Sequence, residues 1–304
     1  MVKGETAFVN SGGLRLCTER FGDPADPVVL LIMGTSEQGI GWPDELVEVL
    51  VAGGRQVIRF DHRDTGQSDC VDFAAAPYTI GDMARDAVAV LDGHRVASAH
   101  VAGASLGGRI GQLLAVHYPD RVRTLTAIMT SPMGYRAGPA WGRAMAGQPP
   151  EPEDLPAPAP EFLSHVAAMA SSQPATSEER IAANVETWRI LNGTALPFDA
   201  DAARRHIEAS IARARDFQAA THHDLASRQM TSERQAPLSR ITAPVLVIHG
   251  TEDPLLPMAN GRAVAELIPG ARFEAVPGMG HGFFSPGIPA KIAGLILDHT
   301  AVRP

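Results

Sequence analysis

The residue of this sequence most clearly placed to do chemistry is a serine between glycines. Ser105 lies in the run Gly103-Ala104-Ser105-Leu106-Gly107, between a short apolar stretch and a stretch whose apolar residues repeat at helical spacing. A strand-to-helix turn of this kind presents a serine hydroxyl at the C-terminal edge of a sheet, and the glycines let the backbone turn tightly. The pattern therefore predicts Ser105 as a nucleophile that attacks an acyl carbon.

A serine nucleophile needs a general base and an acid that orients the base, and here the chain order is serine, acid, histidine. His281 stands between glycines downstream of the last predicted strand, and it is the predicted base. Asp253 follows the predicted strand 245–248 and precedes Pro254, which constrains the chain at that point. We therefore predict Asp253 as the acid, with Glu252 as its rival.

The negative oxygen of a tetrahedral intermediate needs two backbone N–H donors. One is expected from Leu106, directly after the nucleophile. The other is expected from Thr35, in the turn after the apolar run 28–33, where Gly34 gives the turn its freedom. These two amides form the predicted oxyanion hole.

Most of the 11 histidines must have other roles. His62, His100 and His249 fall within or at the ends of predicted strands, so we expect them in the core or supporting the site. His222 and His223 fall in a helical stretch, and we expect them on a solvated helix face.

Short apolar runs alternate with helical patterns along most of the chain. A hairpin pattern comes first, at 6–10 and 14–21. The predicted parallel strands are 28–33, 56–60, 99–102, 125–129, 245–248 and 273–276, and the predicted helices between them are 43–52, 80–91, 106–117, 260–268 and 288–299. This alternation predicts an α/β fold with a mostly parallel central sheet covered by helices on both faces.

The middle of the chain departs from this alternation. Residues 134–160 are rich in Pro, Gly and Ala and are predicted as a loop or hinge. Residues 161–227 are predicted to be helical only, with helices at 162–170, 177–191 and 199–224. We predict a first part of the core at 1–133, a helical cap or lid at 134–235, and a second part of the core at 236–304.

Composition excludes several classes of function. The formal charge is −8, from 26 basic and 34 acidic residues, so nucleic acid and anionic membrane surfaces are unfavourable partners. The only cysteines are Cys17 and Cys70, and neither a disulfide framework nor a zinc ribbon is expected. No signal peptide pattern opens the sequence, so we expect a cytoplasmic enzyme without a metal or cofactor.

Taken together, these residues resemble the α/β-hydrolase superfamily, and within it the aclacinomycin methylesterase group, which tailors anthracycline polyketides. The longer matching stretches lie at 22–27, 41–45, 61–68, 72–75, 188–194, 197–199 and 277–281. The segment 61–68 is similar to the family's arginine- and glycine-containing loop, which is structural and borders the pocket. The resemblance implies removal of a methyl group from a carboxymethyl ester on a bulky aromatic polyketide.

The expected partner is thus a small hydrophobic ester. Its pocket is predicted to be lined by Gly34, Trp42, Met133, Phe162, Met169, Trp188 and Phe283. The same triad also serves lactone or macrolide, C–C bond and thioester hydrolases and perhydrolases, and these alternatives stay open. A ligand receptor built on a hydrolase scaffold is a further alternative. The sequence does not give the oligomeric state.

Overall fold

A single eight-stranded sheet forms the centre of the protein, seen here in a computed structural model that describes residues 4–133, 137–171, 176–228 and 237–301. The strands lie in the order β1-β2-β4-β3-β5-β6-β7-β8. Their bounds are Glu5–Ser11 (β1), Leu14–Phe21 (β2), Val28–Ile32 (β3), Gln56–Phe60 (β4), Ala99–Ala104 (β5), Val122–Ile128 (β6), Val245–Gly250 (β7) and Arg272–Val276 (β8).

The sheet is mostly parallel, as predicted. The β1–β2 hairpin is antiparallel, and β2 also pairs with β4 in antiparallel direction. All remaining neighbours, from β4 to β8, run parallel. The carboxyl ends of these six strands therefore meet at one edge, where open α/β sheets place their ligands.

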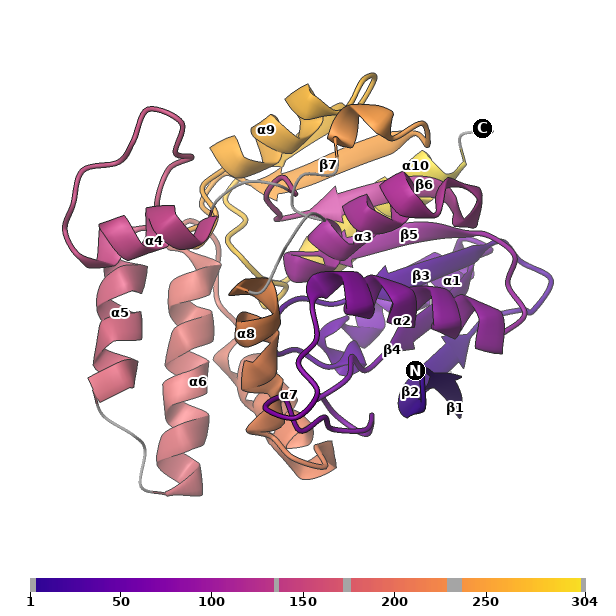
Figure 1. Ribbon diagram of the computed structural model, residues 1–304, viewed down its shortest axis with the longest axis horizontal. Helices are drawn as coiled ribbons and strands as arrows, with labels where there is room; N and C mark the ends of the chain where they lie inside the picture. The colour runs from indigo at the N-terminus through magenta and orange to yellow at the C-terminus, as the bar shows by residue number, and fades with distance from the viewer. Residues whose placement is uncertain (1–3, 134–136, 172–175, 229–236, 302–304) are drawn as a thin grey trace.

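Helices cover both faces of the sheet, and β3 shows how the residues divide between them. Leu30 and Ile32 belong to one buried cluster, and Val29 and Leu31 to the other, because successive side chains point to opposite faces. On the first face lie α2 (Ile80–Gly93), α3 (Leu106–His117) and α9 (Ala259–Leu267); on the second lie α1 (Asp44–Ala52) and α10 (Ile288–Thr300) (Figure 1).

Among the described residues, five further α-helices lie between β6 and β7. They are α4 (Ala137–Met145), α5 (Pro160–Ser171), α6 (Ser177–Asn192), α7 (Ala200–Arg213) and α8 (His222–Arg228). Figure 1 shows α4, α5 and α6 grouped beside the sheet, with α7 and α8 between them and its N-terminal half. The prediction that 161–227 contains helices and no strands is confirmed for the residues described there.

Two predictions for this region are wrong. The single helix expected at 199–224 ends at Arg213, because the amide of Arg215 instead donates to the carbonyl of Gly66, 2.8 Å away. The loop expected at 134–160 contains α4, whose Trp141 packs edge-on against Phe162 with ring centroids 6.0 Å apart. In both places tertiary contacts outweigh the local sequence signal.

The predicted boundaries at 133/134 and 235/236 adjoin residues outside the described part, so the division into core and cap stays a prediction.

Among the described helices, none combines the length and the apolar character needed to traverse a lipid bilayer.

Several histidines are buried in their neutral form. His223 has no exposed surface, which overturns the expectation that it lies on a solvated helix face. The preceding residue, His222, bonds the carboxylate of Asp64 at 3.1 Å. Burial, and then the neighbouring His62, lowers the pKa of His223 to about 3. Burial, and then the charge of Arg123, lowers the pKa of His100 to about 4.

The lowered pKa values of His100 and His223 predict that the free energy of unfolding falls in mild acid. Their pKa values in the folded protein lie below the ordinary value of about 6.5, so the unfolded chain binds more protons below that pH. The free energy of unfolding should be fully retained above pH 6.5 and fall toward pH 4, by at most about 1.4 kcal/mol per pH unit for each histidine. Urea titrations at pH 7, 6 and 5 measure this slope.

The matched variants are His100→Gln and His117→Gln. The first removes one buried histidine from β5 and should flatten the slope, whereas His117 is exposed on α3 and its replacement should leave the slope as in the wild type. A slope of zero between pH 7 and 5 in the wild-type protein would contradict the explanation.

Candidate active site

The turn between β5 and α3 holds Ser105 in a strained backbone conformation. Its φ is 53° and its ψ is −116°, and its amide donates to the carbonyl of Ile128 at 2.9 Å. A Cβ on Gly103 would lie 2.1 Å from the carbonyl oxygen of Gly107, and one on Gly107 would lie 2.0 Å from that of Ile32. Glycine at both positions is therefore a steric requirement of the turn that presents the Ser105 side chain.

Asp253 and His281 are brought together from the loops that follow β7 and β8. The Nδ1 atom of His281 lies 2.7 Å from Oδ2 of Asp253, and both side chains are buried. The main-chain amide of His281 donates to the carbonyl of Leu191 on α6 at 2.6 Å. Because Nδ1 bonds the carboxylate, Nε2 is the ring nitrogen that remains to accept a proton.

The environment of Asp253 keeps its carboxylate charged. The other oxygen, Oδ1, accepts the amides of Leu255 at 3.0 Å and Leu256 at 2.7 Å. Burial alone would raise the pKa of Asp253, but the charge of His281 and the hydrogen bonds from His249 and His281 outweigh it and lower the pKa to about 2. The carboxylate therefore stays ionised, and it stabilises the folded state at every pH above its ordinary value of 3.8.

The rival acid, Glu252, lies apart from this pair. Its side chain is exposed, and its main-chain amide donates to the carbonyl of Met279 at 3.0 Å. Of the two acidic residues weighed from the sequence, the structure brings only Asp253 against the imidazole of His281.

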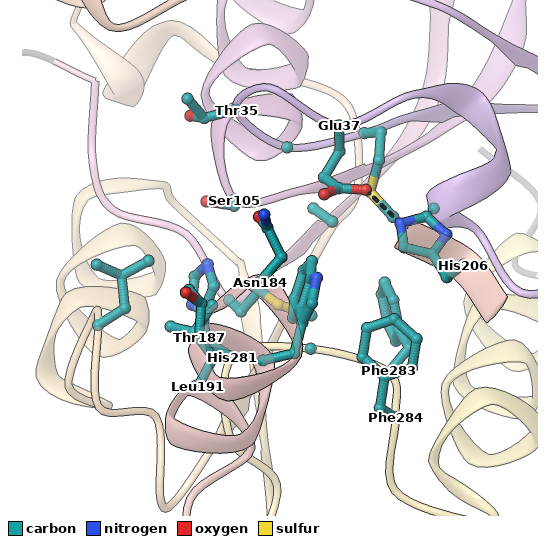
Figure 2. Close-up of a pocket in the computed structure, with 18 residues that line it drawn as sticks. Thr35, Glu37, Ser105, Asn184, Thr187, Leu191, His206, His281, Phe283 and Phe284 are labelled. Carbon is teal, nitrogen blue, oxygen red and sulfur yellow. Dashed lines mark hydrogen bonds and ion pairs between the residues drawn. The ribbon is translucent and has the colours of Figure 1, made fainter. Parts of the chain in front are cut away.

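The turn after β3 lies directly against Ser105. A Cβ on Gly34 would be 3.2 Å from the Cβ of Ser105, and Gly34, Thr35 and Ser105 line one cavity. Leu106 is the first residue of α3, so its amide belongs to the set of helix N-terminal donors that have no partner inside the helix. Figure 2 shows Thr35 and His281 on either side of Ser105.

Contacts from two segments, residues 61–63 and α8, hold this turn. His62 Nε2 bonds the carbonyl of Met33 at 3.0 Å, and the amide of Gly39 donates to Asp61 at 2.9 Å. From α8, the Nδ1 atom of His223 accepts the amide of Ser36 at 3.0 Å, while its Nε2 bonds the carbonyl of Arg63 at 2.9 Å. Residues 61–63 thus hold the turn through hydrogen bonds to Met33 and Gly39. His223 also supports the turn, and the sequence pattern did not reveal this role.

The cavity at Ser105 has a volume of about 240 Å³ and mostly apolar walls. Of the residues predicted for it, Gly34, Trp188 and Phe283 line it together with Ser105 and His281. A correction concerns the other four, which do not line it: Trp42, Met133, Phe162 and Met169.

The physical reason is that large apolar side chains fill the core as readily as a pocket. Trp42 is fully buried against Phe283 at 5.3 Å, and Met133 is buried in the cluster under α3. Phe162 packs among α4, α5 and α6, and Met169 is half-buried on α5.

Sequence reasoning missed the polar part of the lining. Glu37, Asn184, Thr187 and His206 line the same cavity, and Nε2 of His206 lies 2.8 Å from Oε2 of Glu37. Figure 2 shows this pair to the right of Thr35 and Ser105. No local motif marks these residues, because Glu37 lies in the loop after β3, His206 on α7, and Asn184 and Thr187 on α6. In the described ranges, no three His, Cys, Asp or Glu side chains gather as a metal site would require.

Comparison with known proteins places this geometry in a family. The family model of the alpha/beta hydrolase fold matches residues 27–287. A rhodomycin D methylesterase of Streptomyces peucetius is 42% identical over 97% of this chain and 98% of its own length. The rhodomycin D methylesterase of Streptomyces sp. strain C5 is 41% identical, with the same shares covered.

Among solved structures, the 2-hydroxy-6-oxo-6-phenylhexa-2,4-dienoate hydrolase of Rhodococcus sp. strain RHA1 superposes with a TM-score of 0.74. It is 16% identical and the alignment covers 99% of this chain and all of that one, a likeness that concerns the fold alone. The resemblance inferred from the sequence is confirmed by the two Streptomyces relatives. The chain belongs to the α/β-hydrolase fold family, and it is a carboxylic ester hydrolase of the methylesterase group within that family.

Proposed function

We propose that Ser105, His281 and Asp253 form the catalytic triad of a methylesterase that acts on a bulky, largely apolar acyl group. The observation that carries the proposal is the 2.7 Å bond between His281 and the buried Asp253 carboxylate, together with the cavity that His281 and Ser105 both line. An imidazole held by its Nδ1 atom is oriented to take a proton at Nε2.

In the acylation half, the Oγ atom of Ser105 attacks the ester carbonyl carbon and its proton passes to Nε2 of His281. The carbonyl oxygen becomes an anion, which the amides of Thr35 and Leu106 bind. The C–O bond to the methoxy group then breaks, and His281 returns the proton to that oxygen. Methanol leaves, and the acyl group stays bonded to Ser105.

In the deacylation half, a water molecule attacks the acyl carbon while His281 takes its proton. The tetrahedral intermediate collapses, the bond to Oγ of Ser105 breaks, and His281 protonates that oxygen. The products are the free acid and the restored serine. Throughout, the charge of Asp253 stabilises the imidazolium form of His281 and holds its tautomer.

The substrate class rests on the relatives and on the lining of the cavity. Both Streptomyces relatives are named for rhodomycin D, and we propose a related substrate here, a methyl ester on a bulky aromatic polyketide. Met33, Met129, Leu191 and Leu255 give the cavity apolar walls that suit a ring system. The cytoplasmic location predicted from the sequence belongs to the same proposal.

The nucleophile is tested by Ser105→Ala. Loss of the attacking oxygen should lower kcat by roughly 10⁶-fold, as removal of a triad nucleophile does elsewhere. The assay follows the conversion of rhodomycin D to its free acid by mass spectrometry, with p-nitrophenyl butyrate as a second ester. Circular dichroism should show an unchanged fold. Turnover within tenfold of the wild type would remove Ser105 from the mechanism.

The acid is tested by the pair Asp253→Asn and Glu252→Gln. An asparagine cannot hold the imidazolium charge or its tautomer, so kcat should fall about 10⁴-fold. The side chain of Glu252 is exposed, and the carboxylate bonded to His281 is that of Asp253, so the matched change at Glu252 should leave kcat within about twofold of the wild type. Equal losses in both variants, measured with the same two esters, would contradict the assignment of the acid.

A further inference from the structure

A second cavity, of about 170 Å³, adjoins the one at Ser105. It lies between residues 36–38, the helices α6 and α7, and residues 217–221. The two cavities have four lining residues in common: Glu37, Asn184, Trp188 and His206. A group bound at Ser105 and a group in the second cavity would therefore touch the same side chains, as two parts of one extended ligand do.

The side chains on this shared wall offer hydrogen-bond acceptors. Glu37 binds His206 through Oε2, and its carboxylate has further acceptor capacity. One N–H of the Nδ2 group of Asn184 donates to the carbonyl of Arg180 at 2.8 Å, and the Oδ1 atom is the acceptor of that amide. Trp188 adds an apolar ring beside these groups.

Two hydroxyl groups elsewhere in the second cavity are also limited to accepting hydrogen bonds. The hydroxyl of Ser36 donates to the carbonyl of Ala220 at 2.9 Å, and that of Thr221 donates to the carbonyl of Gln218 at 2.7 Å. With their hydrogens engaged, these two oxygens have only lone pairs to offer. No lysine or arginine is among the lining residues of this cavity.

One polar atom in this wall is left without a partner. The side chain of Ser210 is buried, with 7% of the residue exposed, and its Oγ has no hydrogen-bond partner among the described residues. Ser210 lines the second cavity from α7. An unpartnered buried hydroxyl is unfavourable, and a polar group of a ligand in the cavity would supply the missing partner.

We infer that the second cavity is a substrate subsite for a hydrogen-bond-donating substituent, an ammonium or a hydroxyl group, on the acyl part of the ester. The inference deepens the proposed function and rests on it for the identity of the ester. An ammonium group would meet the carboxylate of Glu37 and the ring of Trp188, which both favour a cation. A hydroxyl group would meet Ser210 and the oxygen of Asn184.

The test uses three methyl esters of one anthracene carboxylic acid that differ only on the far ring, by an aminomethyl, a hydroxymethyl or an ethyl group. Binding to Ser105→Ala is measured by quenching of the anthracene fluorescence, so the result does not depend on turnover. The aminomethyl and hydroxymethyl esters should bind at least tenfold more tightly than the ethyl ester. Equal dissociation constants for all three esters would overturn the subsite.

The residues are tested on the same background. Ser210→Ala should reduce the preference for the hydroxymethyl ester about 3- to 10-fold, and Glu37→Gln should reduce that for the aminomethyl ester about 10- to 100-fold. Glu208→Gln, at an exposed position of the same helix α7, is the matched control and should leave both preferences as they are. Unchanged preferences in both subsite variants would overturn the proposal.

Failure of the proposed function would be seen separately. Turnover of the three esters by the wild-type protein reports on the triad, whereas the ratio of dissociation constants reports on the subsite. Absence of turnover together with a retained preference would refute the esterase mechanism and support the subsite. Turnover of all three esters with equal dissociation constants would support the esterase mechanism and refute the subsite.

Discussion

The buried negative charge of Asp253 is the constraint on which the site depends. A carboxylate out of contact with water is costly unless several donors surround it. Here the donors are the amides of Leu255 and Leu256 and the imidazoles of His249 and His281. Because β7 and β8 are paired and parallel, the loops that follow them begin at the same edge of the sheet. Removal of the charge would therefore disturb both loops and not one hydrogen bond alone.

The helices between β6 and β7 are part of this arrangement and not only a cover. The carbonyl of Leu191, near the end of α6, accepts the amide of His281, and Asn192 bonds the hydroxyl of Ser285 at 2.8 Å. On the opposite side of Ser105, His223 of α8 accepts the amide of Ser36. Both loops that flank the nucleophile are thus fastened to the inserted helices, so a displacement of these helices would alter the geometry at Ser105.

Local signals were sufficient for the elements that position the site. The strand 56–60 and the helix 106–117 have the predicted bounds, because strong apolar periodicity and a glycine turn determine them. The break at Arg213 and the helix α4 were missed, since each depends on a contact with a distant segment. The geometry at His281 agrees with the predicted triad, although the roles of its members stay a prediction.

The pocket was the least predictable part, for a reason that its residues make clear. A tryptophan or methionine looks the same in a sequence whether it fills the core, as Trp42 does, or faces a cavity, as Trp188 does. The pairing of Glu37 with His206 spans 169 positions, and no spacing rule connects two such residues.

The same polar residues limit what the pocket accepts. An apolar cavity tolerates any ring system of suitable size, because one methylene more or less changes binding little. A wall with a carboxylate and an unpartnered hydroxyl, such as those of Glu37 and Ser210, discriminates more strongly between ligands. A ligand that covers these two groups without forming hydrogen bonds to them removes them from water and leaves them without partners, which weakens binding. Selectivity among bulky esters is therefore expected from the few polar side chains of this wall and not from the apolar surface that forms most of the cavity.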